Sequence, residues 1–232
     1  QCSSFAEVLI AGLGVCKVLL PDAIKKTVKL VLPDASFGPS NPSGSFSKLA
    51  LADFLEISTW ADCVLLAGDM GRNSETAILL EQYVQKYSGL LVIAQDSADY
   101  FKAFPQLLMN RPNTVLVISL AQLQKIFINA PLMTPITYGM TLPQLAEALH
   151  EFTDKFPLTI VVKHHDLIFV ASGGEVVSTP NTDMPWRVKT AGKAVVYWLQ
   201  NPSEPLESIS TSLQLRTLYL YNTVRIAALV EW

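Results

Sequence analysis

A glycine-containing turn is the first segment whose residue types could bind a phosphorylated ligand. Gly68-Asp69-Met70-Gly71-Arg72 follows an apolar run and precedes a pattern typical of a helix. Glycine lets a backbone approach a ligand closely, and the start of a helix favours an anion. Arg72 would add positive charge. An ordinary connection between a strand and a helix has the same composition, so the turn alone indicates a site only weakly.

Two further charged residues follow apolar runs. Asp96 comes after 91–93, where it could orient a substrate or cap the next helix. Lys163 comes after 159–162, and a lysine that leaves a parallel sheet can pair with phosphate. The adjacent His164 and His165 would point to opposite sides of an extended chain, which makes them a poor chelating pair. We predict no metal site.

The segment Thr190-Ala191-Gly192-Lys193 is predicted to form a turn before a helix that starts at Gly192. A turn of small residues can present backbone amides to a phosphate. It resembles the end of a Walker-type loop only superficially, because the upstream glycine is missing. Lys193 is unfavourable at the start of a helix unless an anion lies nearby. That mismatch favours a functional interpretation.

The elements that must position these residues alternate along the chain. Short apolar runs predict strands at 15–20, 29–32, 63–67, 90–93, 114–118 and 159–162, and a hairpin at 167–178. Helical patterns cover 5–13, 23–28, 50–58, 74–87, 97–108, 120–127, 142–156, 192–199 and 206–221, and 36–45 is predicted to be a loop. This alternation favours an α/β fold with a mostly parallel sheet, helices on both faces, and ligands at the carboxyl ends of the strands.

Composition limits the class of protein. The 232 residues fit one domain, 1–232, and half of them are hydrophobic while 16% are charged. The net charge of −3 argues against nucleic acid as the main partner. No apolar run reaches the roughly 18 residues of a membrane span. Three widely spaced cysteines and a start without a basic, then apolar, leader fit a cytoplasmic protein.

Taken in order, these segments resemble the carbohydrate-kinase-like domain of ADP/ATP-dependent NAD(P)H-hydrate dehydratases, within the ribokinase-like superfamily. The most specific piece is ADCVLLAGDMGRNSETAILL at 61–80, which is similar to the family's A-D-A-V-V-I-G-P-G-L-G-R-S-E-E-T. Looser similarity covers 15–23, 90–98, 113–127 and 158–170, and 189–198 falls where the family has G-G-S-G-D-V-L-A-G. The similarity runs in register from about residue 5 to residue 221.

The resemblance implies a three-layer fold, often oligomeric, that binds ADP or ATP beside a hydrated NAD(P)H. Loss of water would restore NAD(P)H. Carried over by position, the nucleotide-binding residues are Lys163, Thr190, Ala191 and Gly192. The substrate-binding residues are Gly68, Gly71, Arg72, Asp96, Ser119 and Gln122.

Several of the family's polar residues are replaced in this chain. Ala94 stands for the first aspartate of D-A-D, and Ser119 and Gln122 stand for a histidine and a glutamate. Lys193 occupies the position of the general-base aspartate, and loss of such a base commonly costs about 10²–10⁴-fold in rate. We therefore expect lost or reduced catalysis. The chain would then be a nucleotide-binding, regulatory or assembly subunit, either as a homo-oligomer or beside a partner subunit with intact motifs.

Two alternatives stay open. The chain could be an active hydro-lyase or a small-molecule kinase that uses Lys163, Lys193 and Asp96 in new roles. It could also be an α/β interaction module that binds no nucleotide.

Overall fold

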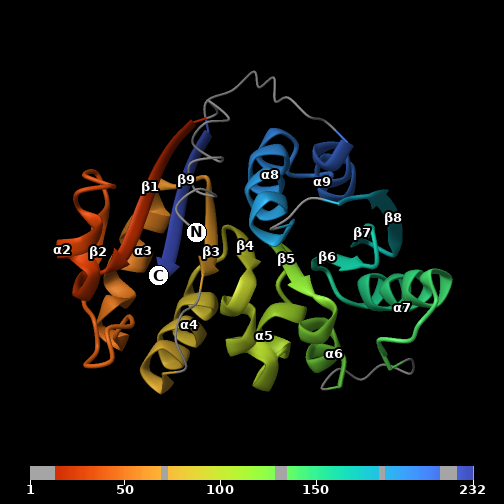
Figure 1. Cartoon of the computed structure of the whole chain (residues 1–232), viewed down its shortest axis with the longest axis horizontal. Coiled ribbons are helices and arrows are strands. Elements are labelled where there is room, and N and C mark those ends of the chain that lie inside the picture. Colours follow the sequence, from red (N-terminus) through yellow and green to blue (C-terminus); the bar gives the residue numbers. More distant parts are fainter. Residues whose placement is uncertain (1–13, 69–72, 129–134, 183–185, 215–223, 232) are drawn as a thin grey trace.

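A nine-stranded sheet forms the middle of the computed structural model, which describes residues 14–68, 73–128, 135–182, 186–214 and 224–231 (Figure 1). The strand order is β2-β1-β9-β3-β4-β5-β6-β7-β8. The strands are β1 (Gly14–Pro21), β2 (Ser36–Gly38), β3 (Cys63–Gly68), β4 (Leu90–Ala94), β5 (Thr114–Ser119), β6 (Thr159–His164), β7 (Leu167–Ser172), β8 (Glu175–Pro180) and β9 (Val224–Glu231). All neighbours from β2 to β6 are parallel, and β7 and β8 continue the sheet as an antiparallel hairpin.

Helices cover both faces of this sheet, so the predicted three-layer α/β fold is confirmed (Figure 1). One face packs against α3 (Leu51–Trp60), α4 (Ser74–Lys86), α5 (Gln106–Met109), α6 (Leu120–Ile128) and α7 (Leu142–Lys155). The other packs against α8 (Trp186–Gln200) and α9 (Pro205–Gln214). Shorter elements are α2 (Lys25–Val28) and the 3-10 segments η1 (Asp22–Ile24), η2 (Lys48–Ala50) and η3 (Gln95–Ala103).

The inner strands read as continuous apolar runs because helices bury them on both sides. Alternate residues of each strand join opposite cores. In β5, Leu116 and Ile118 face α6 and α7, while Val115 and Val117 face α8. A strand buried on both faces can therefore be predicted from its composition without any polar alternation.

Local signals set the helix starts. Thr141 caps α7, since its hydroxyl accepts a hydrogen bond from the backbone N–H of Gln144 and the Gln144 side chain bonds back to the N–H of Thr141. This reciprocal pair satisfies amides that the first turn leaves without partners. The predicted helix at 142–156 is confirmed within one residue at its end.

Some predictions of elements need correction, and others fall outside the described residues. The strand predicted at 29–32 is wrong, because the chain turns there and leaves Leu30 90% exposed. The short strand β2 instead lies inside the expected loop at 36–45. Strand β9 was not predicted, although it fills the gap between β1 and β3. The helix expected at 5–13 and residues 215–221 of the last helix lie outside the described residues.

None of the helices in the described part of the chain is both long enough and apolar enough to cross a membrane.

Candidate functional site

Four parallel strands end side by side at one edge of the sheet, the carboxyl edge. Their last residues are Gly68 in β3, Ala94 in β4, Ser119 in β5 and His164 in β6. Helix α8 begins at the same edge, since Arg187 in its first turn contacts residues that follow β4 and β5. Ligands of open α/β sheets bind at this edge. The candidate site therefore lies between the ends of β4, β5 and β6 and the start of α8.

Ser119 and Lys163 share the face of the sheet that α8 covers. They are paired neighbours on β5 and β6. Val117 and Val161, two positions earlier on the same strands, pack in the core formed with α8. Because side chains alternate along a strand, Ser119 and Lys163 follow Val117 and Val161 to that face. Both side chains are half-buried.

The carboxamide of Gln122 connects the segments of the site. Its Oε1 accepts hydrogen bonds from the N–H and the hydroxyl of Ser119, at 3.0 and 3.2 Å, and from Nη1 of Arg187 at 3.4 Å. Its Nε2 donates to the carbonyl of Gln95 at 2.8 Å and to Oδ2 of Asp99 at 2.9 Å. Gln122 is 6% exposed. With its donors and acceptor engaged, the Gln122 carboxamide positions its neighbours.

Two ion pairs surround this carboxamide. Nη1 of Arg187 lies 3.8 Å from Oδ1 of Asp96, and Nζ of Lys125 lies 3.5 Å from Oδ1 of Asp99. The Arg187 side chain is 31% exposed and that of Asp96 is 56% exposed. Arg187 is thus held at the carboxyl edge between Asp96 and Gln122, and its side chain stays partly open to solvent. The site thus contains three cationic side chains, those of Arg187, Lys125 and Lys163, and the two carboxylates of these ion pairs. The amino end of α8 adds positive potential.

The backbone after β4 is strained. Gln95 adopts a φ of 59°, in the left-handed region that non-glycine residues rarely occupy. Gln122 holds this conformation through its hydrogen bond to the Gln95 carbonyl. Strained residues persist where surrounding contacts fix them, and they cluster at functional sites. Gly68 at the end of β3 has a φ of 107°, which explains why glycine stands there.

The structure brings four of the predicted site residues to one place. Asp96, Ser119, Gln122 and Lys163 follow or end three neighbouring strands, as the sequence analysis expected. Gly68 ends the next strand, β3. Gly71 and Arg72 lie outside the described residues. Among the described residues, no group of three or more histidine, cysteine, aspartate or glutamate side chains is arranged to hold a metal ion.

The turn predicted at Thr190-Ala191-Gly192-Lys193 is wrong. These residues lie inside α8, which begins at Trp186, so their amides bond to carbonyls one turn earlier in the helix. Thr190 and Ala191 are 3% and 1% exposed. Small residues appear here because the helix packs closely on β3, β4 and β5. The segment therefore presents no turn to a phosphate.

Sequence reasoning missed Arg187, Asp99 and Lys125. A signal for Arg187 was available, because proline is favoured at the first positions of a helix and Pro185 precedes Trp186. A helix that starts there would have placed Arg187 in its first turn. Asp99 and Lys125 carry no comparable signal, since each is an ordinary charged residue of a helical segment.

The strand order and the helices on both faces are those of a three-layer α/β fold, and comparison with solved structures shows that this fold is ribokinase-like. A ribokinase-like superfamily protein from Enterococcus faecalis V583 superposes with a TM-score of 0.59 at 15% identity, covering 85% of this chain and 75% of that one. A hydroxyethylthiazole kinase protein from Pyrococcus horikoshii OT3 superposes with a TM-score of 0.52 at 11% identity, covering 92% of this chain and 82% of that one. No protein-family model and no curated protein matches the chain. Likeness at this identity establishes the fold.

Proposed function

We propose that this chain is a divergent NAD(P)H-hydrate dehydratase-like protein that binds a nucleotide at the carboxyl edge and has lost most or all of its catalysis. It would serve as a regulatory or assembly subunit. The observation that carries the proposal is the placement of Arg187 at the carboxyl edge, 3.8 Å from Asp96 and 3.4 Å from Gln122.

Arg187 supports the binding half of the proposal. A guanidinium presents several donors in one plane, which suits the oxygens of a phosphate. Lys163 lies on the same face of the sheet, and the amino end of α8 favours an anion. ADP, ATP and the pyrophosphate of NAD(P)H all carry such groups. A nucleotide phosphate would replace the partly exposed Asp96 as the partner of Arg187, because the phosphate carries the higher charge.

The ion-paired carboxylates support the second half of the proposal, the loss of catalysis. Asp96 and Asp99 are each paired with a cation, and Asp99 also accepts a hydrogen bond from Gln122. Oxygens of both carboxylates are thus engaged by groups of the protein itself. Lys193, at the position that the resemblance gives to the general base, lies about two turns into α8. We therefore do not expect Lys193→Asp to create a dehydratase.

A second candidate is an active small-molecule kinase or hydro-lyase. The similarity in fold to a hydroxyethylthiazole kinase favours the kinase. Once a phosphate had drawn Arg187 away, the 56% exposed Asp96 would be free to accept a proton from a substrate hydroxyl. Assays of phosphoryl transfer and of dehydration of hydrated NADH separate this candidate from the first.

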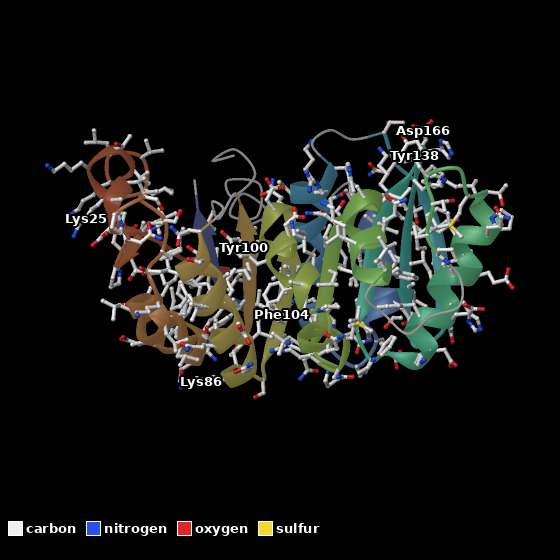
Figure 2. All side chains as sticks on the ribbon, turned by 90° about the horizontal axis from the view of Figure 1, so that it is seen from below. Lys25, Lys86, Tyr100, Phe104, Tyr138 and Asp166 are labelled. Atoms are coloured by element: carbon white, nitrogen blue, oxygen red, sulfur yellow. The ribbon has the colours of Figure 1, made fainter. Side chains whose placement is uncertain are left out.

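Thermal unfolding with ADP, ATP, NADH and NADPH tests nucleotide binding. A ligand at about 100 times its Kd adds about 2.7 kcal/mol of stability, which for a chain of this size raises the Tm by about 5–10 °C. Arg187→Gln should weaken binding about tenfold or more, because a charged hydrogen bond contributes about 1.5–3 kcal/mol. Lys86→Gln removes an exposed cation at the opposite edge of the molecule and should leave binding unchanged (Figure 2).

The outcomes separate the hypotheses. A shift with one nucleotide that Arg187→Gln reduces, without turnover in either assay, agrees with the proposal. Turnover by the unmodified protein would favour the active enzyme instead. If no nucleotide shifts the Tm, the chain is an α/β interaction module and the proposal is wrong.

A further inference from the structure

Strand β1 has an open edge on the side away from β9. Strand β2 pairs only with the last three residues of β1, Leu19 to Pro21. Residues 14–19 of β1 pair with β9 on the other side. Within the described ranges, no strand pairs with the outer edge of residues 14–18. Alternate N–H and C=O groups of that edge point outward, and such an edge is a template for another strand.

A pocket of about 260 Å³ lies beside this open edge, between the β1–β2 pair and α3; we call it the β1–α3 pocket. Its lining comes from the two strands and from one face of α3, with four helix residues at positions i, i+3, i+4 and i+7. These residues are Lys17, Leu19, Ser36, Phe37, Asp53, Glu56, Ile57 and Trp60. Because cofactor sites usually measure about 300–1,000 Å³, the volume favours one side chain over a whole small molecule.

The chemistry of the pocket favours a cation. Asp53 is half-buried and Glu56 is exposed. Lys17 is the one cation of the lining, and its Nζ lies 4.2 Å from the centroid of the Trp60 ring. One ammonium thus faces two carboxylates, which leaves a negative site beside aromatic rings. Arginine suits such a site best, because its guanidinium pairs with carboxylates in a plane and stacks on aromatic faces.

Exposed apolar side chains surround this end of the sheet. Leu30 and Val31, which follow α2, are 90% and 65% exposed, and Val15 on β1 is 53% exposed. Figure 1 shows α2, β1, β2 and α3 together at one end of the molecule.

We propose that the open edge of β1 and the β1–α3 pocket bind an extended segment of a partner protein with an arginine side chain. The segment continues the sheet where β2 stops, and its backbone pairs with residues 14–18. In strand addition the backbone supplies affinity, and pockets for alternate side chains supply specificity. Leu19 packs toward α3, so side chains on that face of the added strand reach the pocket. This surface is separate from the candidate nucleotide site, so the two proposals fail independently.

Isothermal titration with two peptides tests the proposal. The probe is acetyl-Thr-Val-Arg-Val-Thr-amide, and its control has neutral citrulline in place of arginine. We expect the arginine peptide to bind about tenfold tighter, because it adds a charged hydrogen bond to a partly exposed carboxylate. The double variant Asp53→Asn, Glu56→Gln should abolish that preference. The matched double variant Glu147→Gln, Glu204→Gln removes the same charge from exposed sites elsewhere and should retain it.

Two measurements on the unmodified protein keep the test independent of how the variants fold. In amide NMR spectra the arginine peptide should shift signals of residues 14–18. N-methylation of alternate peptide amides should abolish binding, because it removes the donors that pair with the strand edge. Equal binding of the citrulline peptide, or shifts confined to other strands, would overturn the proposal.

Hydrogen exchange identifies other occupants of the edge. The proposal expects fast exchange of the outward amides of 14–18 without peptide. Slow exchange at every protein concentration would mean that the chain covers its own edge. Slow exchange that appears only at high concentration would mean that a second copy covers it. Either result would overturn the proposal.

Discussion

The carboxamide of Gln122 fixes the relative positions of three segments at the carboxyl edge. It links the end of β5, through Ser119, to the strained backbone at Gln95 after β4 and to Arg187 at the start of α8. Hydrophobic packing orders the strands, but it does not place polar side chains that lie beyond their ends. Gln122 performs that task, because its buried carboxamide makes several directed hydrogen bonds.

Gln122→Ala should lower the free energy of unfolding by about 2–3 kcal/mol, because it leaves part-buried donors and acceptors without partners. Denaturant unfolding at pH 7 measures the loss. Gln85→Ala removes the same side chain from an exposed position of α4 and should change stability by less than about 0.5 kcal/mol. Equal effects of the two variants would mean that the network adds nothing to stability.

Part of the site could be predicted from single residues. The placement of Asp96, Ser119 and Lys163 at one edge was predicted because parallel strands bring their carboxyl ends together, so order along the chain is enough. Arg187 was not found, because its place depends on where α8 begins. The small residues 190–192 looked like a turn, whereas they serve close packing of a helix on the sheet.

Among the helices and strands, too, those that local sequence determines were predicted, and those that depend on distant contacts were not. The apolar runs of β3, β4, β5 and β6 predict strands because each is bounded by turns and buried on both faces. Strand β9 depends on pairing with β1 and β3, which are far away in the sequence, and nothing in its own residues specifies that place. The run at 29–32 has the composition of a strand, yet the sheet offers it no neighbour.

The contact between Asp62 and Arg225 helps to dock β9 in register. The carboxylate of Asp62 accepts hydrogen bonds from the backbone N–H of Arg225 at 2.9 Å and from its guanidinium Nη2 at 2.7 Å. The hydrogen bond from the Arg225 side chain lowers the pKa of Asp62 below its usual value. Asp62 therefore stabilises the fold above the pKa of an unfolded aspartate, and this contribution disappears as the pH falls through the lowered pKa.

Asp62→Asn should thus be less stable than the unmodified protein at pH 7, by a small amount because the pair is partly exposed to solvent. The difference should shrink as the pH falls toward 3. Urea unfolding of both proteins across this range measures it. Asp34→Asn, at an exposed carboxylate, serves as the control. A difference that stays constant with pH would show that the charge of Asp62 does not stabilise β9.

At the scale of the whole molecule, the hydrophobic core on one face of the sheet runs from β1 to β7. The core on the face of α3 to α7 extends from Leu19 in β1 to Ala171 in β7 without interruption. The predicted single domain, 1–232, would require the two ends of the sheet to unfold together. A continuous core couples them, because a cavity at one end removes contacts from the same packed cluster.

Leu149→Ala tests this coupling from the α7 end of the sheet. Leu149 is fully buried, so the variant should lose about 2–5 kcal/mol and lower the Tm by roughly 5–15 °C. Calorimetry should show one transition that moves as a unit, and near-UV and far-UV circular dichroism curves should coincide. Leu49→Ala, at a side chain that is 71% exposed, should leave the transition in place. If Leu149→Ala instead splits the transition in two, the α7 end of the sheet unfolds by itself and the chain comprises more than one cooperative unit.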